Sequence, residues 1–591
     1  MMENLKAKMV VDLKANPFNL DDKGIAWVED TLKGMTLEEK IGQLFCLPGF
    51  TTDKNVLEML TQKVGIGGVM FRPENGKTVQ EAHRTLQNSS KIPLLIAANL
   101  EAGGIGLVSE GTNFAKPLQV GATDDPEMGY ALGKISCSEG AAVGCNWSFA
   151  PIVDIDMNFR NPITNLRTFG DNPDRVIKMA KRYMDAANEE GVAVSIKHFP
   201  GDGVDERDQH LLTSVNTLSV EEWDSTFGKV YQELIDYGAQ TVMVGHIAQP
   251  AYAKKLNPAL SGKPVPASLS KELVTGLLRN QLGFNGLVIT DASQMLGYTT
   301  GMKREDAVPT AIAVGCDMFL FTKNMEEDIE FMFKGYHKGI ITDERLNEAV
   351  TRILATKAAL KLHEKQASNT LVPGEEALSL LKTDKHIEWA KECADKGITL
   401  VKNNDGLLPL TKNKYKRVYL NVLERNDDIN SPLRTKIKSM LENEGFEVDL
   451  RNRDFNIDVE AFMAGNIDAR TMEVMQEIGA KVSDFTSKYD LAIYVANFET
   501  ASNNTVIRID WKGLAGMGDD APWFTSEIPI VFISLANPYH LLDAPMVQAY
   551  VNAYTNNEFV LESLIDKLMG RSEFKGKSPV DAFCGREDTK Y

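Results

Sequence analysis

The first 360 residues of the chain alternate short apolar runs with longer amphipathic segments, and this alternation constrains the fold more than any other feature. The apolar runs lack polar alternation, which is typical of strands that are buried on both faces of a sheet. Eight such runs occur, at residues 44–47, 67–71, 94–98, 147–154, 193–196, 241–244, 287–290 and 317–321.

Segments with helical periodicity separate most of these runs. They cover residues 54–63, 78–87, 125–139, 173–189, 220–236, 270–281 and 303–313. Parallel strands need helical crossovers, so eight strands in alternation with helices predict a (β/α)8 barrel of the TIM type. We expect this barrel to occupy residues 1–363.

The character of the sequence changes after residue 362. Residues 364–385 are polar and contain proline and glycine, which predicts a linker. Further apolar runs then alternate with helical segments such as 431–444, and this pattern predicts a smaller C-terminal α/β sandwich domain over residues 386–591. These runs cover residues 398–402, 417–422, 491–496 and 528–535.

Composition and charge exclude several classes of function. The formal net charge of -18 argues against nucleic acid or an anionic membrane as a partner. No apolar run is long enough to span a membrane, and the first residues lack the apolar core of a signal peptide. The six cysteines are scattered without CxxC spacing, which fits a reducing compartment. We therefore expect a cytoplasmic protein.

Polar side chains follow five of the eight predicted barrel strands. In a barrel of this type, catalytic groups lie where a strand ends and the loop to the next helix begins. A single such residue is explained equally well as a helix N-cap, but the recurrence at five strand ends predicts one active site. The residues are Asn99, Glu101, Asp154, Asp156, Lys197, His198, His246 and Asp291.

Three residues have the chemistry of a glycosidase. A carboxylate at a barrel mouth, such as Asp291, can attack an anomeric carbon and form a covalent glycosyl intermediate. Asp208 lies two residues before His210, so its carboxylate could fix the tautomer of the ring and stabilise the imidazolium. Because a free imidazole titrates near neutral pH, such a ring suits a group that gives a proton and later takes one.

Other polar residues are better suited to holding sugar hydroxyls than to nucleophilic attack. An alternative for Arg167 is a purely structural ion pair with Asp154 or Asp171. The side chains that we expect to contact the sugar are Arg167, Lys197, His198, Asn99, Glu101 and His246.

Several short motifs in the chain match a known family. They are Lys-His-Phe-Pro-Gly at 197–201, Asp-Gln-His at 208–210, Arg-Thr-Phe-Gly at 167–170 and Ile-Thr-Asp-Ala-Ser-Gln-Met at 289–295, with a further match at 35–44. On these residues the chain resembles glycoside hydrolase family 3, and in particular its β-N-acetylglucosaminidase (NagZ-like) branch. The likeness covers most of residues 26–360, and residues 397–410 resemble the start of that family's second domain.

This resemblance implies a retaining, exo-acting β-N-acetylhexosaminidase with a carbohydrate substrate and with no cofactor or metal. Asp291 matches the family nucleophile, and His210 with Asp208 matches the general acid/base of the branch. Arg167, Lys197 and His198 match positions that hold the sugar. Other branches, including β-glucosidases, take their acid from a glutamate elsewhere, so the Asp208–His210 pair favours the β-N-acetylglucosaminidase branch.

Three departures from the branch concern the substrate. Asn99 replaces an aspartate that usually accepts sugar hydroxyls, and an arginine of the same loop has no counterpart. Asp202 stands where the branch commonly has a second histidine. These changes leave open a glycone other than plain N-acetylglucosamine, or one that carries a substituent on its outer hydroxyls.

Three other functions remain open from the sequence. An imidazole acid/base does not repel an anion as a carboxylate would, so inorganic phosphate could resolve the intermediate and make the enzyme a phosphorylase. A catalytic metal could instead be held by His198, His210, His246 and Asp291. A protein that binds sugars without catalysis is the last alternative, but binding alone should not need both the nucleophile and the Asp208–His210 pair.

Overall fold

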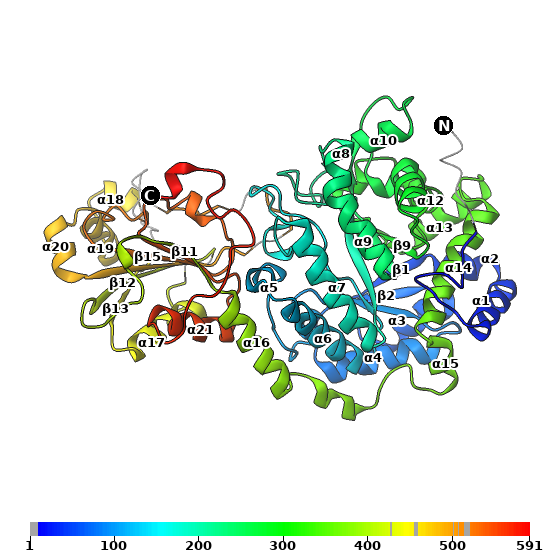
Figure 1. Ribbon diagram of the computed structural model, residues 1–591, viewed down its shortest axis with the longest axis horizontal. Coiled ribbons are helices and arrows are strands. Elements are labelled where there is room, and N and C mark those ends of the chain that lie inside the picture. The colour runs from blue at the N-terminus through cyan, green and yellow to red at the C-terminus, as the bar shows by residue number, and fades with distance from the viewer. Residues whose placement is uncertain (1–9, 426–427, 454–458, 500–501, 506–507, 513–519) are drawn as a thin grey trace. The chain divides into compact units, whose positions relative to one another are not determined.

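The computed structural model divides into two compact units (Figure 1). The first unit comprises residues 1–390 and 501–505, and the second comprises 391–500 and 506–591. The structure describes residues 10–425, 428–453, 459–499, 502–505, 508–512 and 520–591. None of the helices in these described ranges is both long and apolar enough to cross a membrane.

A ring of eight parallel strands forms the centre of the first unit. The strands are β1 (Phe45–Gly49), β2 (Gly68–Phe71), β3 (Leu95–Ala98), β4 (Trp147–Ser148), β5 (Ala193–Phe199), β7 (Thr241–Val244), β9 (Leu287–Thr290) and β10 (Phe319–Leu320). Their order is β10-β1-β2-β3-β4-β5-β7-β9. A parallel bridge between Ile289 and Met318 brings β9 to β10, and the backbone N–H of Thr290 donates to Met318 at 3.1 Å. The ring is therefore nearly closed, and the predicted barrel is confirmed.

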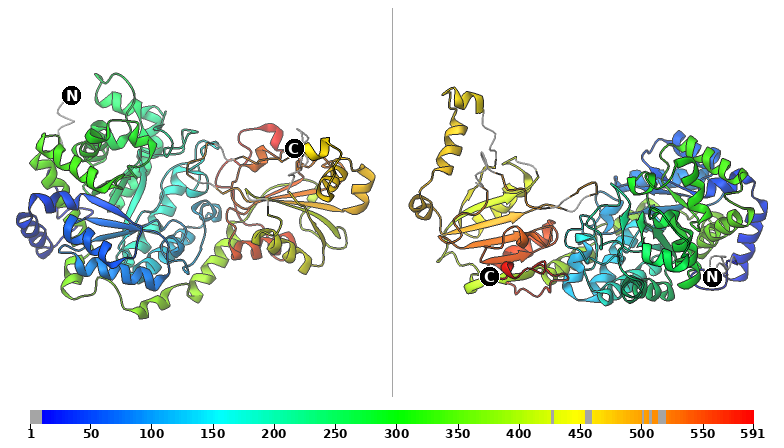
Figure 2. Two further views of the ribbon diagram at one scale, coloured as in Figure 1. Left: turned by 180° about the vertical axis from the view of Figure 1, so that it is seen from behind. Right: turned by 90° about the horizontal axis from the view of Figure 1, so that it is seen from above.

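Helices lie outside this ring of strands (Figure 2). Helix α7 (Pro173–Glu189) shows why they form: Asn172 caps two backbone N–H groups, proline occupies the first turn, and one face is buried. The other principal elements are α3 (Lys54–Met59), η2 (Leu60–Val64), α4 (Gly76–Ser89), α6 (Pro126–Ala142), α8 (Val220–Trp223), η5 (Asp224–Gly228), α9 (Lys229–Tyr237), η7 (Glu272–Gln281), α12 (Arg304–Ala313), α13 (Met325–His337) and α14 (Asp343–Ala359).

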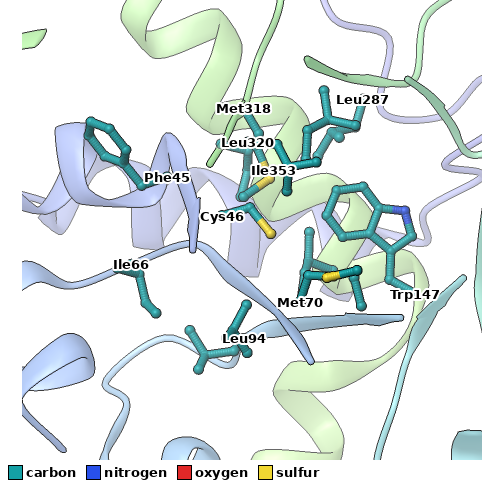
Figure 3. Packing of buried hydrophobic residues seen from close by; sticks show 14 of the residues in the cluster. Phe45, Cys46, Ile66, Met70, Leu94, Trp147, Leu287, Met318, Leu320 and Ile353 are labelled. Atoms are coloured by element: carbon teal, nitrogen blue, oxygen red, sulfur yellow. The ribbon is translucent and has the colours of Figure 1, made fainter. Parts of the chain in front are cut away.

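Buried side chains fill the interior of the barrel, which is a packed core. Figure 3 shows Met70, Trp147, Leu287 and Met318 among the buried side chains of this core. The indole of Trp147 is fully buried and donates a hydrogen bond to Thr241 Oγ1 at 2.9 Å. This tryptophan belongs to the core and is inaccessible to a sugar.

The predicted linker is partly helical. It contains α15 (Leu362–Ala367) and η8 (Glu375–Leu380), and it runs into α16 (Asp384–Gly397). Glu139, which is buried in α6, accepts hydrogen bonds from the backbone N–H of Lys382 at 2.9 Å and from His386 Nδ1 at 2.7 Å. This carboxylate fastens the segment to the barrel helices.

A six-stranded sheet forms the second unit, as the predicted α/β sandwich requires. Its strands are β11 (Thr399–Asn403), β12 (Arg417–Leu423), β13 (Glu447–Leu450), β14 (Leu491–Ala496), β15 (Ile530–Ser534) and β16 (Ala549–Asn552). The order is β11-β16-β15-β14-β12-β13, and β11 alone runs antiparallel to its neighbour. The described helices of this unit include α17 (Pro432–Asn443), α19 (Ala469–Ile478), α20 (Val482–Lys488) and α21 (Glu558–Leu568).

Candidate active site

Asp154 lies in the loop after β4 and is hydrogen-bonded to residues at the end of β5. One of its oxygens, Oδ1, accepts the backbone N–H groups of His198 at 3.0 Å and Asp202 at 2.8 Å. The other, Oδ2, lies 2.7 Å from His198 Nδ1. Asp154 therefore fixes both the imidazole of His198 and the turn that follows β5. The Lys197–His198 peptide bond in this strand is cis.

Glu101 accepts hydrogen bonds from two cationic residues that are predicted to bind the sugar, Arg167 and Lys197. It accepts a bidentate pair of hydrogen bonds from Arg167, at 3.0 and 3.1 Å, and one from Lys197 Nζ at 2.7 Å. Lys197 also contacts Asn99 Oδ1 at 3.3 Å. Burial alone would raise the pKa of Glu101, but the charges of Arg167 and Lys197 outweigh it and hold the pKa well below its usual range. The partner of Arg167 is thus Glu101, rather than the Asp154 or Asp171 considered from the sequence.

Asp291 follows β9 directly, with its backbone N–H bonded to Val244 at 2.8 Å. The side chain is 14% exposed, and Oδ1 accepts the N–H of Ala292 at 2.7 Å. Burial alone would raise the pKa of Asp291, but the positive charge of nearby imidazoles, that of His198 foremost, and the hydrogen bond from the N–H of Ala292 outweigh it and lower the pKa. The carboxylate therefore stays ionised at neutral pH, as a nucleophile requires.

Asp208 and His210 form the expected pair. Oδ1 of Asp208 is 2.7 Å from His210 Nδ1 and also accepts the backbone N–H of His210 at 2.8 Å. Asp208 is buried, whereas 26% of the His210 side chain is exposed. Backbone N–H groups of Leu296 and Gly297 donate to the carbonyls of His210 and Gln209 at 3.0 and 3.2 Å. These bonds tie the loop that carries His210 to the segment that follows Asp291.

His246 supports this segment from behind. Its Nδ1 is 2.8 Å from Ser268 Oγ, and its Nε2 is 3.0 Å from the carbonyl oxygen of Ala292. Burial lowers the pKa of His246, so the ring is neutral and donates through Nε2 to that carbonyl. Both ring nitrogens are thus occupied by protein groups, which makes His246 a support for the residue after Asp291.

Asp202 belongs to the same network, although the sequence marked it only as a departure from the branch. Its Oδ1 accepts the N–H of Gly203 at 2.8 Å and Asn161 Nδ2 at 3.0 Å, and Oδ2 accepts Gln209 Nε2 at 3.3 Å. Burial, together with the charge of Asp154, raises the pKa of Asp202 to about 6. The residue holds the turn between β5 and the Asp208–His210 loop.

Within the described ranges, the geometry does not support a metal centre. Among the residues that the structure describes, no group of three or more His, Cys, Asp or Glu side chains is arranged to hold a metal ion. The Nδ1 atoms of His198 and His210 each contact a carboxylate, and both nitrogens of His246 are engaged.

Comparison with known proteins identifies the family. Residues 36–356 match the family described as "Glycosyl hydrolase family 3 N terminal domain". Over 586 residues the chain is 44% identical to a "Beta-N-acetylglucosaminidase/beta-glucosidase" of Cellulomonas fimi, and the match covers 98% of this chain and all of that one. The chain belongs to glycosyl hydrolase family 3.

Two solved structures show the same architecture. A structure described as "Beta-glucoside phosphorylase BglX" superposes with a TM-score of 0.89 at 44% identity, covering 98% of this chain and 99% of the other. A family 3 β-N-acetylglucosaminidase from Paenibacillus sp. superposes with a TM-score of 0.74 at 24% identity, over 93% of this chain and 99% of the other, which is a likeness of fold alone.

Proposed function

We propose that this family 3 enzyme is a retaining, exo-acting β-glycosidase that cleaves β-N-acetylhexosaminides in the cytoplasm. The observation that carries the proposal is that an ionised Asp291 is followed by a segment hydrogen-bonded to the Asp208–His210 loop. Backbone hydrogen bonds connect that loop to the segment after Asp291, and the charge of His210 lowers the pKa of Asp291. These contacts support a single site for the proposed nucleophile and the proposed proton donor.

In the first step, a carboxylate oxygen of Asp291 forms a bond to the anomeric carbon as the bond to the leaving oxygen breaks. The Nε2–H of protonated His210 gives its proton to that oxygen. Oδ1 of Asp208 accepts the Nδ1–H of His210, which keeps Nε2 directed at the substrate. In the second step, neutral His210 accepts a proton from water as the water attacks the glycosyl ester of Asp291.

The sugar is recognised by Glu101 together with Arg167 and Lys197. Arg167 and Lys197 neutralise this carboxylate, so the three side chains form a preorganised set of donors and acceptors. The name of the Cellulomonas fimi relative covers both N-acetylglucosaminides and glucosides. We expect the present enzyme to prefer the N-acetylated sugar.

Phosphate as the acceptor is the second candidate. The acid/base is a histidine, which does not repel a phosphate anion as a carboxylate would. The BglX structure, at 44% identity over nearly the whole chain, is described as a β-glucoside phosphorylase. Phosphate would attack the glycosyl ester of Asp291, and the product would be a sugar 1-phosphate in place of the free sugar.

One experiment tests nucleophile and acceptor together. Incubation with a 2-deoxy-2-fluoro glycoside that has an activated leaving group should add one fluoroglycosyl mass to the protein, on the peptide that contains Asp291. The Asp291→Asn variant should not be labelled. As a control, Asp22→Asn removes an exposed carboxylate paired with Lys14 and should be labelled like the wild type. Labelling of any other carboxylate would contradict the assignment.

The labelled enzyme then reports the acceptor. Recovery of activity in buffer alone, with the free sugar as product, indicates hydrolysis. Recovery that accelerates with added phosphate, with a sugar 1-phosphate visible by phosphorus NMR, indicates phosphorolysis.

A further inference from the structure

The chain returns to the first compact unit at residues 501–505, long after the barrel sequence has ended. Of these residues, 502–505 are described, and they form a turn. The backbone N–H of Asn503 donates to Oδ2 of Asp208 at 2.6 Å. The two residues are 295 positions apart in the sequence.

This contact completes the hydrogen bonding of the Asp208 carboxylate. Oδ1 serves His210 twice, through its backbone N–H and its Nδ1, and Oδ2 serves Asn503. Because the side chain of Asp208 has no exposed surface, these partners replace water. With a donor on each oxygen, the plane of the carboxylate is fixed, and so is the direction in which Oδ1 meets the imidazole.

The residue type at 503 suits the backbone rather than the contact. Asn503 has a φ of +65°, in the left-handed region where asparagine and glycine are the residues most readily accommodated. The neighbouring Asn504 closes the turn, since its Nδ2 donates to the carbonyl of Ser502 at 3.0 Å. The turn thus presents a backbone N–H to Asp208, and the side chain of Asn503 is not the donor.

We propose that Asn503 is a positioning residue for the acid/base pair. Its N–H holds Oδ2 of Asp208, which in turn keeps Oδ1 in line with His210 Nδ1 and the opposite ring nitrogen directed at the leaving group. This inference rests on the proposed role of His210 as the proton donor. It assigns to residues 502–505 a function in protonation, whereas attack by Asp291 does not depend on them.

Two substitutions separate the N–H from the side chain. Asn503→Pro removes the donor and forces a negative φ, whereas Asn503→Gly keeps both the N–H and the positive φ. For a substrate with an alkyl leaving group, we expect kcat/KM of the proline variant to fall by about 10- to 100-fold, the usual range for a lost supporting hydrogen bond. For a dinitrophenyl leaving group, both variants should stay within about 2-fold of the wild type, because protonation is then unnecessary.

A double-mutant cycle tests the proposal even if the proline also disturbs the turn. In a His210→Ala background, Asn503→Pro should cost nothing further on either substrate, because its effect passes through the imidazole. An equal loss with and without His210 would overturn the proposal, and so would a glycine variant as impaired as the proline variant. If His210→Ala alone lowers both substrates equally, the assigned acid is wrong, and that outcome is independent of residue 503.

Discussion

Nε2 of His198 lies 3.9 Å from Oδ2 of Asp291. The opposite nitrogen of the same ring, Nδ1, is 2.7 Å from Asp154. An ionised carboxylate can only accept hydrogen bonds, so Nδ1 carries a proton, and in the neutral form of the ring it is Nε2 whose lone pair faces the site. Asp154 therefore decides which nitrogen of His198 faces the nucleophile and the sugar.

Substitution of Asp154 by asparagine should reverse this tautomer. The amide oxygen can still accept the backbone N–H groups of His198 and Asp202, but the NH2 group would face Nδ1, which must then become an acceptor. We expect the proton of neutral His198 to move to Nε2 and kcat/KM to fall by about 10- to 100-fold. Nitrogen NMR of histidine-labelled protein would report the move, and unchanged ring shifts for His198 would contradict it.

Loss of the proton donor should depend on the leaving group. In His210→Ala, substrates with alkyl leaving groups should lose about 10²- to 10⁴-fold in kcat/KM, the usual contribution of general acid catalysis. Dinitrophenyl glycosides need no protonation of the leaving group, so their kcat/KM, which reports the first step, should stay near the wild-type value. Steady-state kinetics on both substrates makes the comparison, with Asp22→Asn as a control that should alter neither. Equal losses on both would exclude His210 as the acid.

The eight barrel strands could be predicted because burial on both faces makes them continuous apolar runs. By contrast, β13 and β16 of the second unit could not be predicted from the sequence. β13 pairs only with β12 at an edge of its sheet, so half of its residues are exposed and its apolar content is low. β16 is only four residues long and begins and ends with the small Ala549 and the polar Asn552.

For the candidate site, the sequence indicated the main residues but not all of their hydrogen-bond partners. Asp291, Asp208 and His210 follow strands or lie in one short motif, so their positions could be inferred from the sequence alone. The partnership of Arg167 with Glu101 spans 66 residues and depends on how two loops fold. The contact of Asn503 with Asp208 uses a backbone N–H, which every residue except proline has, so no residue type marks it.

Asp202 gives the stability of the protein a predictable pH dependence. Its pKa is about 6 in the folded state, against 3.8 for an ordinary aspartate, because it is buried beside Asp154. Between these values the folded protein holds a proton that the unfolded chain releases, so this group lowers stability as pH rises from about 4 to 6. The full cost, about 2–3 kcal/mol at 1.36 kcal/mol per pK unit, is present above pH 6.

The Asp202→Asn variant removes this titration. The free energy of unfolding of the variant, relative to the wild type, should therefore rise between pH 4 and pH 7, whatever fixed amount the lost contact with Gln209 costs. Denaturant titrations at several pH values measure the difference. A difference that stays constant across this range would show that Asp202 does not titrate there.

Asp317 should be a large contributor to the stability of the barrel. Its Oδ2 accepts Arg279 at 2.6 Å and the backbone N–H of Val288 at 2.9 Å, and its Oδ1 accepts Arg345 at 2.5 Å. A third guanidinium, that of Arg352, lies 3.5 Å away, and all four side chains are almost fully buried. Burial alone would raise the pKa of Asp317, but these three positive charges outweigh it and lower the pKa.

Asp317→Asn would remove the one carboxylate that all three guanidinium groups contact, and Glu348 would remain as a counter-charge for Arg345 and Arg352. Removing one partner of a buried ion pair typically costs about 3–5 kcal/mol, because the remaining charge stays desolvated. We expect Tm, followed by circular dichroism, to fall by at least about 5 °C. Asp174→Asn is the matched control, because it breaks an exposed pair with Lys229 and should shift Tm by no more than about 1 °C. Equal shifts in the two variants would mean that other contacts stabilise the three arginines around Asp317.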